Sequence, residues 1–389
     1  MRLLWVTAEP PDRAGGGGNI RQAHLLDAVA GAGHQIDLLL AGPDPDAETA
    51  AAVYRMLRPP TRPSRRPTSH QQQRLLGLRL AVWGGPAELY DNRGARRALS
   101  SAWPNDEYDV VLVEHAGLAP LISHRRHRER WVCTLHNIAS GTADALKELA
   151  PGRRQRLLIA RDGRQAAKLE RFVVEKYDSV ISVSAEDADL LPGLSVVVPN
   201  GVDLKAFMPT PLPATPTLLF TGTLSYLPNV DGLRWFCDSV LPRLRTLVPE
   251  VVFHIVGRDP TPAMRALANL DNVVVHADVP AVTPYLHGAR VCVVPLRMGT
   301  GSRLKALEAM AAGRPLVGTT VGLAGLGITD QAVVEDHPVV LADALARLLL
   351  HDGDAQRLAS AGRDHVEQAF GWPSVGSRLV RHLEEVSSR

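Results

Sequence analysis

Short apolar runs alternate with amphipathic segments along most of the chain. The runs that predict buried strands lie at 3–7, 36–40, 110–113, 131–135 and 179–184, and then at 217–221, 252–256, 273–276, 291–295 and 316–319. The segments that repeat apolar side chains at helical spacing, or end at a helix stop signal, are 19–31, 152–176, 231–247, 263–269, 303–312 and 372–386. Strands that alternate with helices predict mainly parallel sheets covered by helices, which is the α/β class.

A break in this alternation divides the chain into two series. Asn200-Gly201-Val202-Asp203 is a turn signal, and the segment 204–217 that follows is rich in proline and threonine. The length of 389 residues and a hydrophobic content of 45% are enough for two cores. We therefore expect two doubly wound domains, at 1–203 and 204–371, followed by a tail helix at 372–389.

The segment 297–320 contains the clearest chemical signal. Ser302 is the expected N-cap of a helix, so Arg303 and Lys305 lie in the first turn, where the helix dipole disfavours each cation by about 0.3–1 kcal/mol. A bound anion such as a diphosphate would reverse that cost. Glu308 follows on nearly the same face, where its carboxylate can accept hydrogen bonds from two hydroxyls, as a ribose offers. The alternative is an ordinary surface pair of Lys305 with Glu308.

A second helix start has a similar character. Four glycines, Gly15 to Gly18, precede a helix predicted from Asn19, and Arg21 places a cation near its free backbone N–H groups. The spaced G-x-G-x-x-G fingerprint is absent, so the signal for a dinucleotide oxidoreductase is weak. If the two halves face each other, an anion between them would be held from both sides.

Two polar pairs follow strands of the first series. Glu114-His115 and His136-Asn137 stand at strand ends, where ligands collect in open α/β sheets. The alternative for each histidine is that it only satisfies local backbone groups. The basic helix 152–176 is expected to be mostly a solvated face.

The stretch 55–79 is rich in arginine and proline and contains no acidic residue. It is either a solvated loop or a flap that attracts an acidic acceptor or a lipid headgroup. Peripheral contact with a membrane through this stretch is the second of these expectations.

Composition narrows the function classes. A net charge of +2 argues against a dedicated nucleic-acid binder. No apolar run has the length of a signal peptide core or a membrane span, and the three cysteines are isolated. We expect a cytoplasmic protein, with peripheral location at the inner face of the membrane as the variant that 55–79 would permit.

Five motifs in the expected order resemble the retaining glycosyltransferases of family 4. They lie at 15–26, 196–203, 219–236, 253–260 and 299–317. The resemblance implies the GT-B fold, in which two Rossmann-like domains face a central cleft and the tail helix crosses back to the N-terminal domain. It also implies a nucleotide diphosphate sugar as donor, a hydroxyl acceptor, and no metal or other cofactor.

The resemblance also assigns roles to individual residues. Glu308 resembles the glutamate that holds the donor ribose, His136 the histidine that contacts the transferred sugar, and Arg303 with Lys305 the cations on the diphosphate. Gly257 and Arg258 resemble the part that frames the nucleobase. The other residues predicted at the substrate are Gly16, Gly17, Gly18, Arg21, Asn200, Gly222, Thr223, Thr300, Gly301 and Ser302.

Three positions depart from the family pattern. Thr300 stands where the family usually has a first glutamate, and Thr223 and Asn229 stand where it commonly has an arginine and a lysine. Arg303 and Lys305 supply two cations from another loop, an exchange that resembles a subset of polysaccharide and secondary-metabolite transferases. The rival hypotheses are a nucleotide-sugar epimerase or phosphorylase on the same fold, and a nucleotide-sugar binding protein without catalysis.

Overall fold

The computed structural model describes most of the chain, in two units. The described residues are 1–8, 10–13, 17–40, 55–57, 107–125, 128–149, 152–191, 193, 195–299 and 303–389. One unit consists of Met1–Pro199 with Val375–Arg389, and the other of Asn200–Ser374. Among the described residues, no helix is both long and apolar enough to cross a bilayer.

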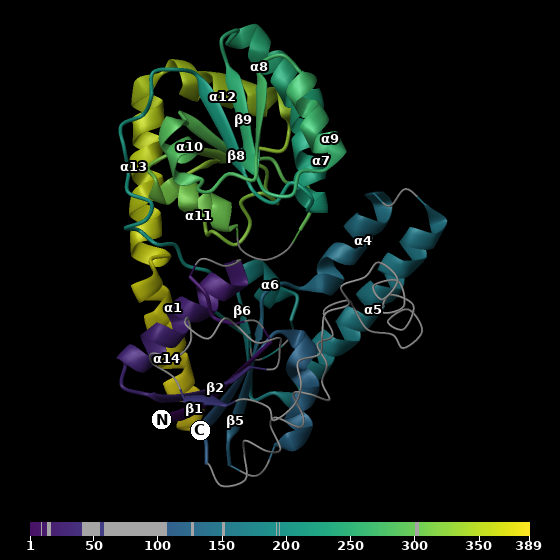
Figure 1. The fold of residues 1–389 in the computed structure, drawn as a ribbon, viewed down its shortest axis with the longest axis vertical. Coiled ribbons are helices and arrows are strands. Elements are labelled where there is room, and N and C mark those ends of the chain that lie inside the picture. The colour runs from purple at the N-terminus through teal and green to yellow at the C-terminus, as the bar shows by residue number, and fades with distance from the viewer. Residues whose placement is uncertain are drawn as a thin grey trace. The chain divides into compact units, whose positions relative to one another are not determined.

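The first unit is built on a parallel sheet with the order β3-β2-β1-β4-β5-β6-β7 (Figure 1). Its described strands are β1 (Arg2–Thr7), β2 (Gln35–Leu40), β3 (Arg55–Leu57), β4 (Val110–Glu114), β5 (Arg130–Leu135), β6 (Ser179–Ser182) and β7 (Ser195–Val197). The helices are α1 (Gly17–Gly31), α4 (Ala139–Leu149), α5 (Arg153–Lys176), α6 (Ala185–Asp189) and α14 (Trp372–Ser387), with a 3₁₀ segment at Ala116–His124. Most strand residues are buried on both faces, as a parallel sheet covered by helices requires.

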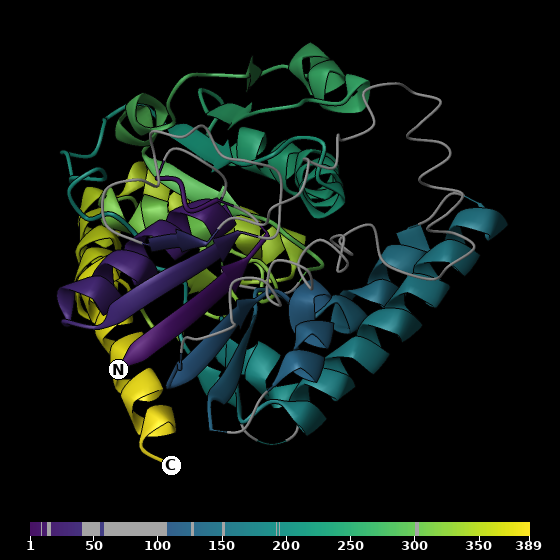
Figure 2. The ribbon, with the colours of Figure 1, turned by 60° about the horizontal axis from the view of Figure 1, so that its bottom comes forward.

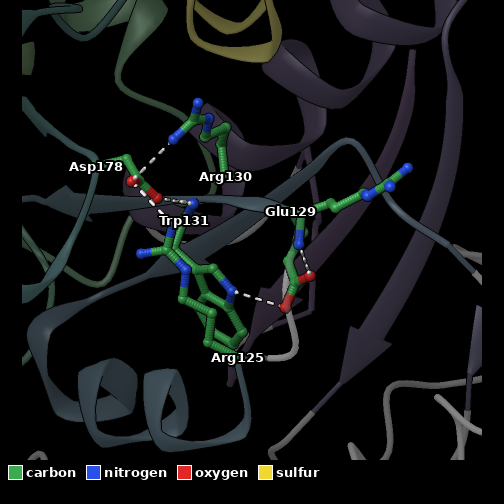
Figure 3. Close-up of polar contacts among 6 residues, drawn as sticks. Arg125, Glu129, Arg130, Trp131 and Asp178 are labelled. Carbon is green, nitrogen blue, oxygen red and sulfur yellow. Dashed lines mark hydrogen bonds and ion pairs between the residues drawn. The ribbon is translucent and has the colours of Figure 1, made fainter. Parts of the chain in front are cut away.

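Polar contacts fix the start of β5 (Figure 3). The Asp178 carboxylate accepts a hydrogen bond of 2.7 Å from the Trp131 backbone N–H and forms an ion pair of 3.0 Å with Arg125. Glu129 accepts a longer hydrogen bond, 3.4 Å, from the Trp131 indole N–H. Because Asp178 precedes β6, these contacts hold β5 in register with its neighbour and so determine where the carboxyl end of β5 lies.

Helix α14 packs on the first unit although it follows the second in sequence. Its His382 ring lies 2.9 Å from the Ser179 hydroxyl, and Glu384 lies 3.1 Å from His34 on the loop before β2. A Cβ atom on Gly376 would lie 2.4 Å from Ala28 Cβ, so glycine allows α14 to approach α1 closely.

The second unit contains a parallel sheet with the order β10-β9-β8-β11-β12-β13. Its strands are β8 (Thr217–Thr221), β9 (Val252–Gly257), β10 (Val273–Ala277), β11 (Val291–Val294), β12 (Leu316–Gly318) and β13 (Val333–Val334). The helices are α7 (Leu227–Trp235), α8 (Leu241–Leu247), α9 (Pro262–Arg265), α10 (Thr283–Gly288), α11 (Leu304–Ala311), α12 (Pro338–Leu350) and α13 (Asp352–Ala369). The α/β class and the two doubly wound sheets are confirmed.

The predicted helix 231–247 was wrong in extent and continuity. Helix α7 begins at Leu227, and a π-helical turn, Phe236–Val240, separates it from α8. Pro242 has no N–H to donate, so a regular helical hydrogen bond cannot form at that point, which is consistent with the wider turn just before it.

Candidate functional site

The second unit has a topological switch point between β8 and β11. From β8 the chain moves to β9 and β10 on one side of the sheet, and it then returns to β11 and β12 on the other. The segments that leave the carboxyl ends of β8 and β11 therefore diverge and create the position at which ligands bind in such sheets. Gly222 follows β8, and the loop after β11 leads to α11.

The start of α11 carries no acidic side chain in its first turn. The helix begins at Leu304, with Arg303 in the N-cap position, so the prediction of Ser302 as N-cap was wrong by one residue. The Arg303 guanidinium donates hydrogen bonds to the carbonyl oxygens of Gly299, at 2.9 Å, and Val321, at 3.1 Å. These bonds fold the side chain back onto neighbouring loops and account for its burial.

Lys305 points its ammonium group toward the loop after β8. Nζ donates a hydrogen bond of 2.8 Å to Asn229 Oδ1 and lies 4.0 Å from the centre of the Phe220 ring. Burial and then the charge of Arg303 lower its pKa to about 7, against the opposing effect of Glu308. Within the described part of the chain Lys305 forms no direct ion pair with a carboxylate, and its hydrogen-bond partner is the neutral Asn229 side chain.

Glu308 lies one turn further along α11. Burial raises the pKa of its carboxyl to about 7, although the charge of Lys305 acts in the opposite direction. A lysine and a glutamate that both titrate near neutrality lie where a charged ligand would change the protonation of both.

Two glycines allow the loops around Lys305 to approach one another. A Cβ atom on Gly222, where φ is +155°, would lie 2.7 Å from Lys305 Nζ. A Cβ atom on Gly257 would lie 1.8 Å from the Gly222 carbonyl oxygen, closer than any side chain permits. The Leu224 N–H donates to the Arg258 carbonyl at 2.8 Å, which joins the loops after β8 and β9.

The first unit has its own switch point, between β1 and β4. Glu114 ends β4, and His136 follows the neighbouring strand β5. His136 Nε2 lies 2.6 Å from Glu114 Oε2, and the His115 ring stacks on the His136 ring with centroids 4.1 Å apart. Parallel strands bring their carboxyl ends to the same edge, so the two strand-end pairs predicted from the sequence meet.

Electrostatics favour an ionised Glu114. Burial raises the pKa of this carboxyl, but the hydrogen bond and charge of His136, together with Arg21, outweigh it and keep the pKa below its ordinary value. The pKa of His115 falls to about 3, first because of burial and then because of His136. His115 also has a φ of 72°, a strained conformation for a residue with a side chain, and such strain clusters at functional sites.

Arg21 lies deeper than the sequence led us to expect. Its guanidinium is 1% exposed and donates to the carbonyls of Val198, at 2.8 Å, and Pro199, at 2.6 Å. Burial lowers its pKa to about 10, so it remains protonated at neutral pH. Its contact with an anion stays a prediction.

Two family models match the chain in succession. Residues 15–206 match the model described as Glycosyltransferase Family 4, and residues 215–351 match the model described as Glycosyl transferases group 1. The chain belongs to the family 4 glycosyltransferases.

Several similar proteins align with nearly the whole length of this glycosyltransferase. The glycogen synthase of Mycobacterium tuberculosis is 28% identical over 98% of this chain and 94% of its own length. Sucrose-phosphate synthase from Thermosynechococcus elongatus has a TM-score of 0.72 at 20% identity and covers 100% of this chain and 99% of its own. Anabaena HepE in complex with UDP and glucose has a TM-score of 0.63 at 14% identity, with coverage of 99% and 100%. At these identities the two structures show the GT-B fold alone.

A cation lies beside each of the two residues, Thr223 and Asn229, that stand where the family commonly has an arginine and a lysine. The Lys305 ammonium contacts the Asn229 side chain, and Arg258 Nε lies 3.3 Å from the Thr223 hydroxyl. The glycosyltransferase therefore has positive charge next to both positions, delivered from α11 and from the loop after β9. Arg303, the other cation that the sequence suggested, donates to two carbonyl groups, and its contact with a diphosphate stays a prediction.

The structure brings some of the predicted site residues together and does not test the roles of any. Gly222, Thr223, Gly257, Arg258 and Lys305 form one neighbourhood in the second unit. Glu308 follows Lys305 on α11, and Arg21, His136 and Arg303 have the contacts given above. The other described candidates are Gly17 and Gly18, which open α1, and Asn200, the first residue of the second unit. The predicted residues outside the described part of the chain are Gly16, Thr300, Gly301 and Ser302.

Two features of the site were not predicted from the sequence. The Phe220 ring beneath Lys305 has no distinctive signal, because a buried phenylalanine at a strand end resembles any core residue. The pairing of Glu114 with His136 was indicated only by their common location at strand ends.

Proposed function

We propose that this glycosyltransferase moves a sugar from a nucleotide diphosphate sugar to a hydroxyl acceptor, with retention of anomeric configuration and without a metal or other cofactor. The observation that carries the proposal is the Lys305 side chain, which lies at the switch point of the second unit and forms no direct ion pair with any described carboxylate. A diphosphate beside Lys305 and Arg258 would supply the missing negative charge.

The donor would be held by contacts of different kinds. Lys305 and Arg258 would bind the diphosphate, and the Glu308 carboxylate would accept hydrogen bonds from the ribose hydroxyls, as the family resemblance implies. Because cations and backbone N–H groups meet the phosphate charge directly, the site does not require a bridging metal ion.

Sugar transfer would break the bond between the anomeric carbon and the phosphate oxygen. Positive charge then develops on the sugar ring and negative charge on the leaving diphosphate, which Lys305 and Arg258 would stabilise. The acceptor hydroxyl attacks the anomeric carbon from the leaving-group face, and its proton passes to the departing phosphate. His136, oriented by the ionised Glu114, would contact the transferred sugar.

The acceptor class is a hydroxyl of a glycan, a lipid-linked sugar or a natural product. The name of the Mycobacterium tuberculosis relative supports a glycan.

We place the enzyme in the cytoplasm, which is supported by three buried cysteines that are free rather than paired. The proposed contact of 55–79 with a membrane or an acidic acceptor stays a prediction, since 58–79 lies outside the described residues.

The decisive experiment compares Lys305→Met with Lys205→Met, a matched variant at an exposed lysine of the same unit. We expect Lys305→Met to lower kcat/KM by about a hundredfold to a thousandfold, as loss of one donor to a developing anion does, while Lys205→Met keeps it. Equal turnover in the two variants would refute the role of Lys305.

Nuclear magnetic resonance of the first-formed product reports its anomeric configuration, and an inverted product would refute retention.

A second comparison isolates the ribose contact. Glu308→Gln should weaken donor binding by about tenfold to a hundredfold. A donor whose ribose lacks the 2′-hydroxyl should lose a similar factor with the wild-type enzyme and much less with Glu308→Gln, because the same hydrogen bond is removed in both cases. Full additivity of the two losses would place Glu308 away from the ribose.

Conversion of donor in the absence of acceptor would favour the epimerase, and donor binding without transfer or hydrolysis would favour the binding protein.

A further inference from the structure

Helices α4 and α5 form an antiparallel arm of the first unit whose two helices lie side by side (Figure 2). The Glu170 carboxylate on α5 accepts hydrogen bonds from the Ser140 backbone N–H, at 3.2 Å, and from the Ser140 hydroxyl. A Cβ atom on Gly163 would lie 2.4 Å from Ala143 Cβ, so the helices touch where glycine permits. These contacts give the arm a fixed surface.

The arm concentrates positive charge. Residues 139–176 contain nine lysine or arginine side chains against five acidic ones, although the whole chain has a net charge of only +2. The remainder of the chain is therefore net negative, and the positive charge of the arm is local.

Five of these cations recur on one face of α5. At 100° per residue they fall within about 80° of one another and extend over about 27 Å of helix. We call this face the basic stripe, and its members are Arg153, Arg161, Arg164, Lys168 and Arg171. Apart from Arg161, each is exposed and forms no ion pair within the described part of the chain.

Exposed leucines and a hollow accompany the basic stripe. Leu157 lies between Arg153 and Arg161 on the same face and is 63% exposed, and Leu158, about 60° outside the arc of the stripe, is 41% exposed. A hollow of about 580 Å³ is lined by residues of both α4 and α5. Small residues and Leu157 contribute to its lining, and its charged lining residues are the four cations Lys147, Arg153, Arg156 and Arg164 and the single carboxylate Asp144.

We propose that this face docks on an anionic lipid bilayer, with the basic stripe on the phosphate headgroups and the two leucines in the interfacial layer. Cations and exposed aliphatic side chains on one helical face are what such a surface binds, through electrostatic attraction together with apolar burial. A soluble polyanion would use the cations but would leave Leu157 and Leu158 without a role. Docking goes beyond sugar transfer, because no residue of the arm is assigned to the donor site.

The test is co-sedimentation of the full chain with lipid vesicles. We expect binding to vesicles of phosphatidylcholine mixed with phosphatidylglycerol, little binding to phosphatidylcholine alone, and loss of binding as salt rises. Absence of binding to the anionic vesicles, or equal binding to both kinds, would overturn the proposal.

Charge-matched variants separate the basic stripe from the net charge. The stripe variant, Arg164→Gln with Lys168→Gln and Arg171→Gln, should bind anionic vesicles about a hundredfold more weakly, since each cation near such a surface contributes about fivefold. The control variant changes three exposed arginines elsewhere to glutamine: Arg265, Arg378 and Arg381. Equal weakening by both variants, or none by the stripe variant, would overturn the proposal. Thermal unfolding of each variant verifies that it is folded.

The leucines distinguish a bilayer from a polymer. Leu157→Ala with Leu158→Ala should weaken vesicle binding by about tenfold, whereas the same change at Leu247 and Leu350, exposed leucines of the second unit, should have little effect. Wild-type affinity in the leucine variant, together with displacement of the protein from vesicles by heparin, would show that the stripe binds polyanions and would overturn docking on lipid.

Discussion

The protonation of Lys305 and Glu308 should make donor affinity pass through a maximum near neutral pH. Both groups titrate near 7 in the unliganded protein, the lysine because burial and Arg303 lower its pKa and the glutamate because burial raises it. In the proposed complex, donor binding would perturb both at once, by placing a diphosphate near the ammonium and ribose hydroxyls near the carboxylate.

The size of the perturbation follows from the charges. One negative charge about 4 Å from Lys305, at an effective dielectric constant of about 20, contributes about 4 kcal/mol, or about three pKa units. This shift would return the lysine from about 7 to near its ordinary value of 10.5. Glu308 would then face a fully charged lysine and donated hydroxyl groups, so its pKa falls from about 7 toward its ordinary 4.5.

The two shifts act on opposite sides of neutrality. The pKa of Lys305 is higher in the complex, so its contribution to binding is complete below about pH 7 and is lost as pH rises. The pKa of Glu308 is lower in the complex, so its contribution is complete above about pH 7 and is lost as pH falls. On each side of the maximum, donor affinity should fall by nearly tenfold per pH unit. Donor binding should be accompanied by proton uptake on the alkaline limb of this profile and by proton release on the acidic limb.

Isothermal titration calorimetry in buffers of different ionisation enthalpy measures both the affinity and the protons exchanged. The ligand should be a nucleotide diphosphate sugar, or its non-hydrolysable phosphonate analogue, because the terminal phosphate of a free nucleotide titrates near pH 6 itself. Glu308→Gln should abolish the acidic limb, and Lys305→Met the alkaline one. Wild-type affinity that stays constant between about pH 6 and pH 9, with no proton exchange, would refute the reasoning.

Two further variants test the geometry of the loops and strand ends. Glu114→Gln should lower kcat by about a hundredfold with little change in donor affinity, because the ionised partner that orients His136 is lost; an unchanged kcat over the full pH profile would contradict this. Gly257→Ala should lower the free energy of unfolding by more than about 3 kcal/mol, since its Cβ would collide with the Gly222 carbonyl. Gly288→Ala, with no atom within 4 Å of the added Cβ, should cost less than about 1 kcal/mol in the same denaturant titration, and equal losses would show that the close approach is relieved by movement.

The strands were predictable wherever a proline or a glycine stands at each end of an apolar run. Strand β8 lies at Thr217–Thr221 as predicted, because Pro216 and Gly222 enclose the run. Helix boundaries were harder to predict. Leu227-Pro228 opens α7 before any strong apolar periodicity, since proline is favoured in the first turn of a helix and the cap has no side-chain signal.

The sequence predicted a cation at the start of α11, but it did not predict which residues this cation contacts. Lys305 attracted attention because a cation in the first turn of a helix is unfavourable without an anion. Its hydrogen bond to Asn229 joins positions 76 residues apart, and only the arrangement of β8 beside β11 brings them together. The positive φ of His115 was not predicted from the sequence, because histidine tolerates positive φ mostly in the αL region and His115, with φ of 72° and ψ of 138°, lies outside it.

The helix that carries Lys305 affects the protonation of this lysine at the proposed donor site. The field at a bound diphosphate depends on where the ammonium lies, so a lysine on α11 whose Nζ is 2.8 Å from the Asn229 side chain can replace a lysine at that position. The replacement has a consequence, because Lys305 shares its helix with Glu308 and the charge of each shifts the pKa of the other. A lysine supplied by the loop after β8 would lie on a different element from the carboxylate proposed to bind ribose. A lysine on α11 is coupled to Glu308, so in the proposed complex the diphosphate would favour the charged lysine, the ribose would favour the charged glutamate, and each contact would strengthen the other.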